Sequence, residues 1–396
     1  MPSHLKNPHN LRKKCVYYAE FVMYIYQHEN WPHFIWDKTR VLTLLAQVKL
    51  AQGLLLGKMQ NLGFEIKGNA QLQSLTEEIL KSNQIEGQLL NVQQVRSSIA
   101  RKLGMPAEDI PVSRYIEGTV DMMLDATQYY NAPVNKKRLC AWHKHMFTSG
   151  KSGWYAIQTG CYRDDKLGPM QVVSDPMGME KVHYQAPDAS VLDGEMEKLF
   201  DFVNNDKTDN VIKAGIIHLW FVILHPFDDG NGCIARALTE LLLARSENRP
   251  TRFYSMSSAI EKERKMYYKQ LEITQRGDLD ITEWLVWFLE ILEKAIKNAD
   301  VLLKTTLDKA KFWGKHQSEF FNERQSKILN KLFEGFKGHL TSTKWAIICK
   351  CSQDSASRDI SDLQRRGILK QLGQGEIRII CWQVSWWNRA TDESMS

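Results

Sequence analysis

Apolar residues recur at steps of three and four along most of the chain, with polar residues between them. This spacing places the apolar side chains on one face of an α-helix, so the chain is expected to be mainly α-helical. Helices are predicted over residues 41–59, 115–130, 135–147, 191–204, 211–224, 234–245 and 292–315.

One segment in the middle of the chain departs from this helical pattern. Between Thr159 and Val173, a stretch with glycine and two aspartates is followed by the alternating residues M-Q-V-V. Turn-forming residues next to an alternating segment are typical of a β-hairpin. The sequence therefore predicts a small hairpin over residues 159–173.

The last part of the chain, residues 326–382, predicts two helices, a short turn, a third helix and then strands. Residues 352–354 supply the turn and cap the following helix, and residues 373–375 can form the tip of a two-stranded wing. This order of elements resembles a winged helix-turn-helix domain.

The charges of this C-terminal segment leave its partner open. Its basic side chains could contact DNA phosphates, but acidic side chains among them reduce the positive field. DNA binding through residues 326–382 and a role in dimerisation or target docking therefore stand as alternatives. The basic side chains are Arg358, Arg365 and Arg366, and the acidic ones are Asp354, Asp359 and Asp362.

Composition narrows the class of protein only a little. At 396 residues the chain is long enough for about two or three domains, each with its own core. The formal net charge of +6 permits contact with nucleic acid without requiring it. No apolar run reaches the roughly 18 residues that span a bilayer, so no membrane partner is expected.

The seven cysteines are scattered and odd in number, unlike a disulfide framework. They indicate a reducing environment, and the expected location is the cytoplasm. Cys349 and Cys351 are too close in sequence for the usual spacing of a metal finger. His143 and His145 lie two residues apart, which places them on different faces of a helix and argues against a metal-binding pair.

The stretch H-P-F-D-D-G-N-G-C-I-A-R, from His225 to Arg236, lies between two predicted helices and is expected to join them. Gly230, Asn231 and Gly232 allow the backbone to approach a ligand closely and to turn amide groups inward. The following helix adds the positive end of its dipole. The stretch is therefore predicted to bind phosphate.

Charged and titratable side chains of the same stretch complete the predicted site. His225 lies where a helix ends before a proline, and its ordinary pKa near ~6.5 suits a general base at neutral pH. Asp229 offers a hard oxygen ligand, which suits Mg²⁺ shared with the phosphates of a nucleotide. Arg236 lies one helical turn after Cys233, so both face the same ligand.

The stretch resembles the signature of the Fic family, H-P-F-x-(D/E)-G-N-G-R-x-x-R. Members of this family typically transfer AMP from ATP to a hydroxyl side chain of a protein. The resemblance implies that His225 deprotonates the target hydroxyl, that Asp229 holds Mg²⁺, and that Arg236 contacts the terminal phosphate. It also implies that Asn231 and the glycine amides bind the nucleotide phosphates. Phe227 is expected to be a structural anchor in the core.

The chain departs from the signature at Cys233, a nucleotide-binding position where the family has its first arginine. Losing this arginine removes a charged hydrogen bond to phosphate, worth about 1.5 to 3 kcal/mol. Nucleotide affinity or rate is therefore expected to fall by roughly tenfold to a hundredfold. Weakened activity is expected rather than none.

A second motif, S-N-Q-I-E-G, lies ahead of the signature and resembles the family's inhibitory motif, (S/T)-x-x-x-E-(G/N). In the subgroup with an amino-terminal inhibitory helix, the glutamate pairs with the last arginine of the signature and blocks productive ATP binding. The resemblance implies that Ser82, Glu86 and Gly87 form this element and that Glu86 pairs with Arg236. The alternative is that Glu86 is a solvated residue of an ordinary helix.

The predicted hairpin resembles the Fic flap, which pairs with an extended segment of the target and presents its hydroxyl. Strand addition binds through backbone hydrogen bonds with little readout of sequence. On this resemblance Met170, Gln171, Val172 and Val173 dock the target. A plain surface hairpin is the alternative.

The expected fold is mainly α, with a Fic-type helical core, a small β-hairpin flap and a C-terminal winged helix-turn-helix domain. The resemblance runs from Met23 to Trp382. Within the family, the chain is similar to a common bacterial subgroup. The expected organisation is a flexible leader at 1–22, an N-terminal helical region at 23–110, a catalytic core at 111–295, a helical connector at 296–325, the winged helix at 326–386 and a tail at 387–396.

The function implied is that of an autoinhibited protein adenylyltransferase. It would use ATP with Mg²⁺ and modify a Ser, Thr or Tyr hydroxyl of a target protein or of itself. One alternative is removal of AMP from a modified protein, with Glu86 orienting a water. Another is a DNA-binding regulator with a weakened nucleotide site. A homodimer is compatible with each reading.

Overall fold

The computed structural model describes residues 23–60, 62–166, 168–174, 181–333, 336, 340–372 and 376–379. The predicted leader at 1–22, the predicted wing tip at 373–375 and the predicted tail at 387–396 lie outside the described residues. The chain separates into two compact units, one up to Ala299 and one from Asp300. Each unit is described by itself.

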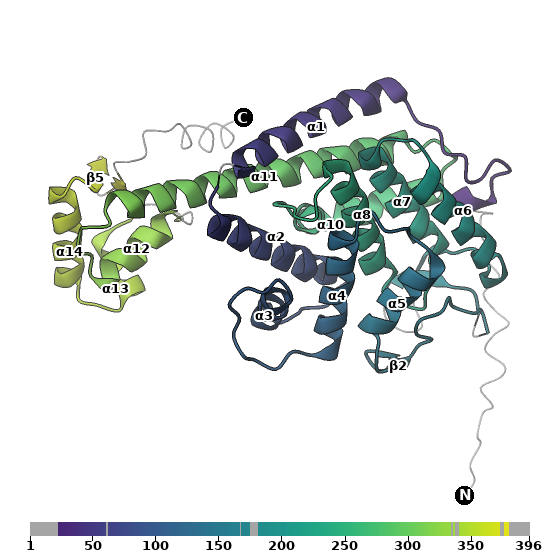
Figure 1. Ribbon diagram of the computed structural model, residues 1–396, viewed down its shortest axis with the longest axis horizontal. Helices are drawn as coiled ribbons and strands as arrows, with labels where there is room; N and C mark the ends of the chain where they lie inside the picture. Colours follow the sequence, from purple (N-terminus) through teal and green to yellow (C-terminus); the bar gives the residue numbers. More distant parts are fainter. Residues whose placement is uncertain are drawn as a thin grey trace, which may run out of the picture. The chain divides into compact units, whose positions relative to one another are not determined.

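Helices dominate both units, which confirms the mainly α-helical prediction (Figure 1). The first unit contains α1 (Lys38–Gln60), α2 (Phe64–Ile85), α3 (Val92–Lys102), α4 (Arg114–Gln128), α5 (Lys136–Met146), α6 (Leu192–Asn205), α7 (Asn210–Leu224), α8 (Asn231–Glu247), α9 (Met256–Lys262), α10 (Arg264–Gln275) and the first part of α11 (Thr282–Lys315).

The helices α7 and α8 form the centre of the first unit. Every residue of α7 from Val211 to Leu224 is buried, and α8 is buried from Cys233 to Ala244. A helix that is apolar on all sides requires neighbours on all sides, and α2, α4, α5 and α6 pack around this pair. The short loop between α7 and α8 is therefore held on a rigid scaffold.

A glycine sets the distance between α4 and α5. A Cβ added at Gly118 of α4 would lie 1.9 Å from the carbonyl oxygen of His145 at the end of α5. The two helices can approach this closely only because position 118 lacks a side chain.

The helix α1 lies at the surface of the first unit (Figure 1), and Arg40 near its start pairs with Glu283 of α11. By length and composition alone, it is the one described helix that could cross a membrane. The prediction concerned unbroken apolar runs, and Lys49 and Gln52 interrupt α1, so the absence of a membrane partner stays a prediction. Gln52 is buried, and its side-chain amide donates to the Tyr254 hydroxyl at 3.0 Å.

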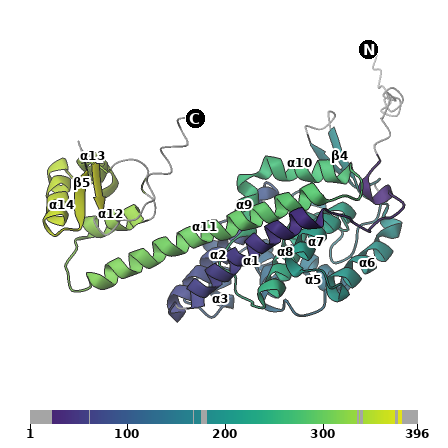
Figure 2. The ribbon, with the colours of Figure 1, turned by 90° about the horizontal axis from the view of Figure 1, so that it is seen from above.

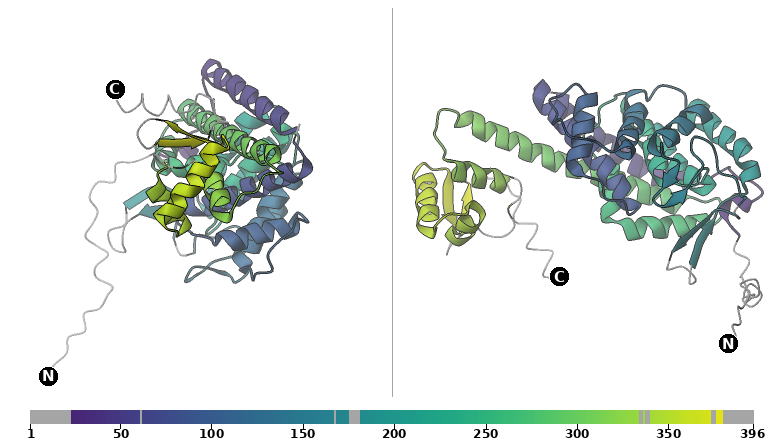
Figure 3. Two further views of the ribbon diagram at one scale, coloured as in Figure 1. Left: turned by 90° about the vertical axis from the view of Figure 1, so that its left-hand side faces the viewer. Right: turned by 90° about the horizontal axis from the view of Figure 1, so that it is seen from below.

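Three pairs of short antiparallel strands complete the described structure. They are β1 (Lys151–Ser152) with β2 (Tyr155–Ala156), β3 (Gln171–Ser174) with β4 (Lys181–Gln185), and β5 (Leu369–Leu372) with β6 (Glu376–Ile379). The β3–β4 pair projects from the helices of the first unit (Figure 3). β4 lies beside α10 (Figure 2), and Arg276 at the end of α10 donates to the His183 carbonyl at 2.9 Å.

The hairpin predicted over residues 159–173 is wrong in its pairing. Gln171 pairs with Gln185 and Val172 with Tyr184, so the partner strand comes after β3 rather than before it. Residues 159–165 form no strand. Their backbone is used elsewhere, since the Arg163 amide donates to the Pro226 carbonyl at 2.9 Å.

The second unit contains the end of α11 and the helices α12 (Glu323–Phe333), α13 (Ser342–Cys349) and α14 (Gln353–Arg365), followed by β5 and β6. Trp345, Leu329 and Leu363 belong to its own apolar core. Ser352 caps α14 by accepting from the Ser355 amide at 3.2 Å, as predicted. The order of elements is the one expected from the sequence, and the assignment to a winged helix stays a prediction.

Candidate active site

The backbone at the end of α7 presents His225 to the site. His225 has a left-handed conformation, with φ of 47° and ψ of 56°, and it ends the helix. Its Nδ1 lies 3.2 Å from the Val222 carbonyl oxygen. A carbonyl oxygen only accepts, so Nδ1 carries the proton and Nε2 keeps a free lone pair. Burial lowers the pKa of His225, which keeps the imidazole neutral at pH 7.

Arg163 holds the loop that follows. Its Nε donates to the His225 carbonyl oxygen at 2.8 Å, and its backbone amide donates to Pro226. A further nitrogen, Nη2, donates to the Pro187 carbonyl. The side chain is buried. This role of Arg163 was not predicted, because Arg163 falls in the segment assigned to the hairpin.

Phe227 anchors the loop in the core, as predicted. It is fully buried and stacks on His143 with ring centroids 4.4 Å apart. His143 Nδ1 accepts from the Gly160 amide at 3.1 Å, and burial lowers the His143 pKa to about 4. His145 is exposed on another face of α5. Within the described residues, no group of three or more His, Cys, Asp or Glu side chains could hold a metal by itself.

Asn231 closes the loop onto itself. Its Oδ1 accepts from the Phe227 amide at 3.0 Å, and its Nδ2 donates to the Phe227 carbonyl at 2.7 Å. Both ends of the side-chain amide are therefore used inside the loop. In this structure Asn231 shapes the loop, and its predicted contact with nucleotide stays a prediction.

Asp229 is half-buried in the same loop. Its Oδ2 accepts from the Ser152 hydroxyl, and its Oδ1 accepts from the Gly230 amide at 2.6 Å. The neighbouring Asp228 accepts from the Gln158 amide at 2.8 Å. These contacts fix the orientation of the Asp229 carboxylate, which forms no ion pair with the described residues.

Two glycines of the signature are required for different reasons. Gly230 precedes α8 with a φ of 76°, and an added Cβ would lie 2.8 Å from the Phe147 ring. At Gly232 an added Cβ would lie 2.0 Å from Oε1 of Glu86. Glu86 therefore lies directly against the first turn of α8.

Arg236 joins the two motifs that the sequence singled out. Its Nη2 lies 2.8 Å from Oε1 of Glu86, its Nε donates to the Ser82 hydroxyl at 2.7 Å, and Nη2 also donates to the Ser82 carbonyl at 2.8 Å. The side chain is fully buried, while that of Glu86 is one third exposed. The structure therefore brings Ser82 and Glu86 to Arg236, as the resemblance implied.

Arg236 stays charged in its buried position. Burial disfavours the charged form, and neighbouring groups, led by the Glu86 carboxylate, raise the Arg236 pKa against it. The third nitrogen, Nη1, is buried without a hydrogen-bond partner within the described residues. A buried, charged donor without an acceptor is costly, which makes an anionic ligand favourable at this point.

Cys233 lies on the same face, one turn before Arg236. Its sulfur is 3.6 Å from Nη2 of Arg236 and 4.0 Å from the Asn83 side-chain oxygen. Burial raises the pKa of the thiol, so Cys233 is neutral. The site therefore holds one cationic side chain where the signature would place two.

The end of α2 is fixed against its neighbours on several sides. The Tyr115 hydroxyl donates to Asn83 at 2.8 Å, and the Tyr268 hydroxyl donates to the Ile85 carbonyl at 2.9 Å. Gly87, at a φ of 83°, ends the helix. Glu86 is therefore part of a well-packed helix end rather than a solvated side chain on an ordinary surface helix.

Comparison with known proteins agrees with the signature. Residues 133–243 match the model of the Fic/DOC family, and residues 24–105 match a domain of unknown function. The chain contains a Fic/DOC domain. This domain includes α5 to most of α8, and with them the loop at 225–230.

The relatives are distant and match only part of the chain. Over 88 residues the chain is 34% identical to a protein adenylyltransferase, fic-1, of Caenorhabditis elegans. These residues are 22% of this chain and 16% of the nematode protein. Over 103 residues it is 26% identical to a probable protein adenylyltransferase, aq_aa38, of Aquifex aeolicus, covering 26% and 30% respectively. The chain thus matches less than a third of the length of these relatives.

The solved structures that resemble this chain are also low in sequence identity. A Fic family protein from Desulfovibrio desulfuricans G20 gives a TM-score of 0.49 at 18% identity, covering 88% of this chain and 98% of the other. A fragment of fic-1 from C. elegans gives 0.46 at 20% identity, covering 68% and 74%.

The strand pair β3–β4 exposes the predicted docking residues. Val172 and Val173 on β3 are 37% and 48% exposed, and Gln171 is exposed as well. The Met170 carbonyl accepts from the Ala186 amide at 3.0 Å, which extends the pairing by one residue. The four residues lie on one short strand segment, and their contact with a target stays a prediction.

His218 and two of the arginines considered for DNA contact are held by neighbouring side chains. His218 is buried between Thr239 and Tyr267, each 2.9 Å from a ring nitrogen, and burial lowers its pKa to about 3. In the second unit, Arg365 pairs with Asp362, and Arg366 pairs with Glu319 and Asp362. These ion pairs reduce the charge available for DNA.

Proposed function

We propose that this chain is an autoinhibited protein adenylyltransferase that transfers AMP from ATP to a hydroxyl side chain. The observation that carries the proposal is Arg236, a buried guanidinium in the signature whose donors are held by Ser82 and Glu86. The Fic/DOC match and the names of the distant relatives support the same activity.

The reaction follows from the side chains at the end of α7 and the start of α8. Nε2 of His225 removes the proton from a Ser, Thr or Tyr hydroxyl. The hydroxyl oxygen attacks the α-phosphorus of ATP, a new P–O bond forms, and pyrophosphate leaves with the electrons of the broken bond. The amides at the start of α8 and the Arg236 guanidinium stabilise the charge on the phosphates.

Asp229 is the residue that would hold Mg²⁺. Ser152 and the Gly230 amide already orient its carboxylate. Mg²⁺ typically binds through one or two carboxylates together with substrate phosphates and water, so one aspartate fits. Bound there, the ion would neutralise charge on the phosphates of ATP.

Inhibition in this proposal is competition between two anions for Arg236. Oε1 of Glu86 lies 2.8 Å from Nη2, close to the position that a phosphate oxygen needs for the same bond. The two anions would also repel each other. Replacing Glu86 by glycine therefore frees Arg236 for nucleotide.

The test is transfer of label from α-labelled ATP with Mg²⁺, using intact protein and cell lysate as source of target. Three forms are compared, wild type, Glu86→Gly, and Glu86→Gly combined with His225→Ala. We expect strong labelling only in the second. Labelling that does not depend on His225, or none in Glu86→Gly even with Cys233→Arg added, would overturn the proposal.

Removal of AMP from a modified protein is a second candidate, favoured by the partial exposure of Glu86. The ion pair involves Oε1, and a carboxylate one third exposed at the site can orient a water. Release of AMP from a modified target, lost in Glu86→Gly, is the expected result. A modified target that keeps its AMP with every divalent metal would exclude this activity.

The proposal extends to the partners and the location of the protein. The target segment would pair with β3, and the protein would work in the cytoplasm, on another protein or on itself. A homodimer and DNA binding through the second unit stay predictions from the sequence. The paired arginines of α14 favour a docking role over DNA.

A further inference from the structure

A pocket of about 600 Å³ lies at the other end of α2 from Glu86. Lys67, Gly68 and Gln71 of α2 form one wall, which places the pocket ~22 Å along the helix from Ser82. The opposite walls come from the segment after α3 and the segment after α8. None of these residues belongs to the site described above.

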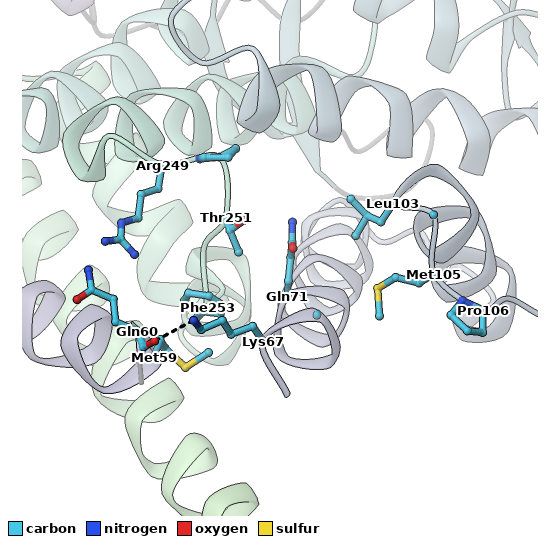
Figure 4. A pocket seen from close by; sticks show the side chains of 13 residues that line it. Met59, Gln60, Lys67, Gln71, Leu103, Met105, Pro106, Arg249, Thr251 and Phe253 are labelled. Carbon is cyan, nitrogen blue, oxygen red and sulfur yellow. Dashed lines mark hydrogen bonds between the residues drawn. The ribbon is translucent and has the colours of Figure 1, made fainter. Parts of the chain in front are cut away.

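The lining of the pocket combines an apolar body with two cations (Figure 4). Figure 4 shows Arg249, Gln60 and Lys67 on one side and Leu103, Met105 and Pro106 on the other. Among the described residues that line the pocket, no side chain is acidic. A ligand that matches this lining carries a negative charge at one end and a hydrocarbon body at the other.

Arg249 is the better placed of the two cations. It follows α8, where its backbone amide donates to the Ala244 carbonyl at 3.1 Å. Its guanidinium makes no hydrogen bond or ion pair within the described residues, and it is half-buried. Lys67, by contrast, donates to the Gln60 carbonyl at 2.9 Å. An anion would thus gain an unpaired guanidinium and a nearby ammonium.

We propose that this pocket binds a small apolar anion, such as a medium-chain carboxylate, and that binding stabilises the arrangement in which Glu86 pairs with Arg236. The first part stands on the lining alone. The second part rests on the proposed function.

The physical connection is the segment after α8, which lines the pocket and also holds α2. Phe253 lies in the pocket, and the next residue, Tyr254, accepts from the Ser74 hydroxyl at 2.9 Å. Ser255 donates to Glu78 at 2.7 Å, and the Ser257 amide donates to the same oxygen at 3.0 Å. A ligand between Arg249 and Lys67 therefore bridges α2 and the segment after α8, which already holds α2 in place.

Whether a bound anion favours or opposes inhibition depends on which arrangement of α2 forms the pocket. The pocket exists while α2 is docked and Glu86 meets Arg236. A ligand favours the state that it binds more tightly, so an anion in this pocket favours the docked, inhibited state. The coupling is reciprocal, so the anion and ATP should weaken each other's binding.

The experiment uses the full chain and measures binding before activity. Decanoate is titrated against protein containing the fluorescent anion 8-anilinonaphthalene-1-sulfonate, and decyltrimethylammonium serves as the cation of equal chain length. The variants are Arg249→Glu and Arg249→Gln. The matched control is Lys137→Glu, an exposed lysine on α5. Thermal unfolding verifies that each variant is folded.

We expect decanoate, but not the cation, to displace the probe from wild type and from Lys137→Glu. Both Arg249 variants should bind decanoate roughly tenfold to a hundredfold more weakly, as for the loss of one charged hydrogen bond. Equal displacement by the cation, or unchanged affinity in both Arg249 variants, would overturn the pocket assignment.

A second titration tests the coupling. Saturating decanoate should raise the Kd of wild type for Mg-ATP and leave that of Glu86→Gly unchanged, because the competing anion is gone. An equal response in both forms would overturn the coupling. Label transfer by Glu86→Gly is read separately, so loss of the pocket and loss of the proposed activity give different results.

Discussion

Arg236 is the residue on which both proposed states of the Fic/DOC domain depend. In the structure its donors go to Ser82 and Glu86, apart from a buried Nη1 that has no partner in the described chain. A phosphate that replaced Glu86 would satisfy the same guanidinium. The two states therefore differ mainly in which anion this one side chain binds.

The first prediction concerns Cys233. In the Glu86→Gly background, Cys233→Arg should restore a second charged hydrogen bond to phosphate, worth about 1.5 to 3 kcal/mol. We expect kcat/KM for ATP to rise roughly tenfold to a hundredfold in steady-state labelling. Cys233→Ala is the control and should leave kcat/KM within about twofold. A rise in both variants would show that loss of the thiol, not gain of charge, matters.

The second prediction concerns pH. Burial holds the pKa of His225 below its ordinary value, and the Glu86 charge acts in the opposite direction. Removing Glu86 should lower this pKa further, so His225 stays neutral and able to accept a proton below pH ~6.5. The acid limb of kcat/KM for Glu86→Gly should therefore have its midpoint below about 6.5. A midpoint at or above that value would contradict a buried, neutral base.

The sequence motifs predicted which residues lie together better than which contacts each one makes. His225, Phe227, Glu86 and Arg236 could be assigned because the motifs place them at fixed spacing on helix ends. Arg163 could not, because its contacts to the loop join segments 62 residues apart in sequence. The side-chain contacts of Asn231 within the loop are likewise a consequence of the folded backbone.

At the scale of elements, the contact between α4 and α5 shapes the wall behind the signature loop. The third prediction is that Gly118→Ala destabilises the first unit by at least roughly 1 to 3 kcal/mol, since the new methyl group would meet backbone atoms rather than a flexible side chain. Urea unfolding measures the change. Gly53→Ala on α1 is the matched control, because an added Cβ there has nothing within 4 Å.

The control should stabilise the protein by roughly 0.5 to 1 kcal/mol, because alanine favours a helix over glycine. If both substitutions have the same effect on the free energy of unfolding, close packing at Gly118 is not the cause.

Helices were predictable from the spacing of apolar residues, and strand pairing was not. α4 was expected at 115–130 and spans Arg114–Gln128. The partner of β3 was misplaced because a strand of four residues carries little pattern, and pairing depends on which backbone groups remain free. The segment before β3 bonds to the signature loop instead.

At the scale of the whole molecule, the chain has two separate apolar cores. The core of the second unit includes Trp345, which is fully buried, whereas Ile347 on the same helix is 71% exposed. The second unit therefore has an apolar core of its own.

The fourth prediction follows from these separate cores. Trp345→Ala should destabilise the second unit by roughly 3 to 5 kcal/mol through the cavity that it leaves. Hydrogen exchange should accelerate across α12 to α14, while label transfer by the Glu86→Gly form persists. Ile347→Ala is the control, with an expected change within about 0.5 kcal/mol. Loss of transfer in Trp345→Ala alone would show that the second unit supports the site.

The contact between Glu86 and Arg236 has a consequence for the gene that encodes this chain. One nucleotide change converts a glutamate codon into a glycine codon, and one converts a cysteine codon into an arginine codon. Release of inhibition at position 86 and strengthening of the site at position 233 are thus each a single mutation away. If unrestrained transfer harms the host, we expect selection to tolerate either change alone more readily than both together, and alleles carrying both to be depleted.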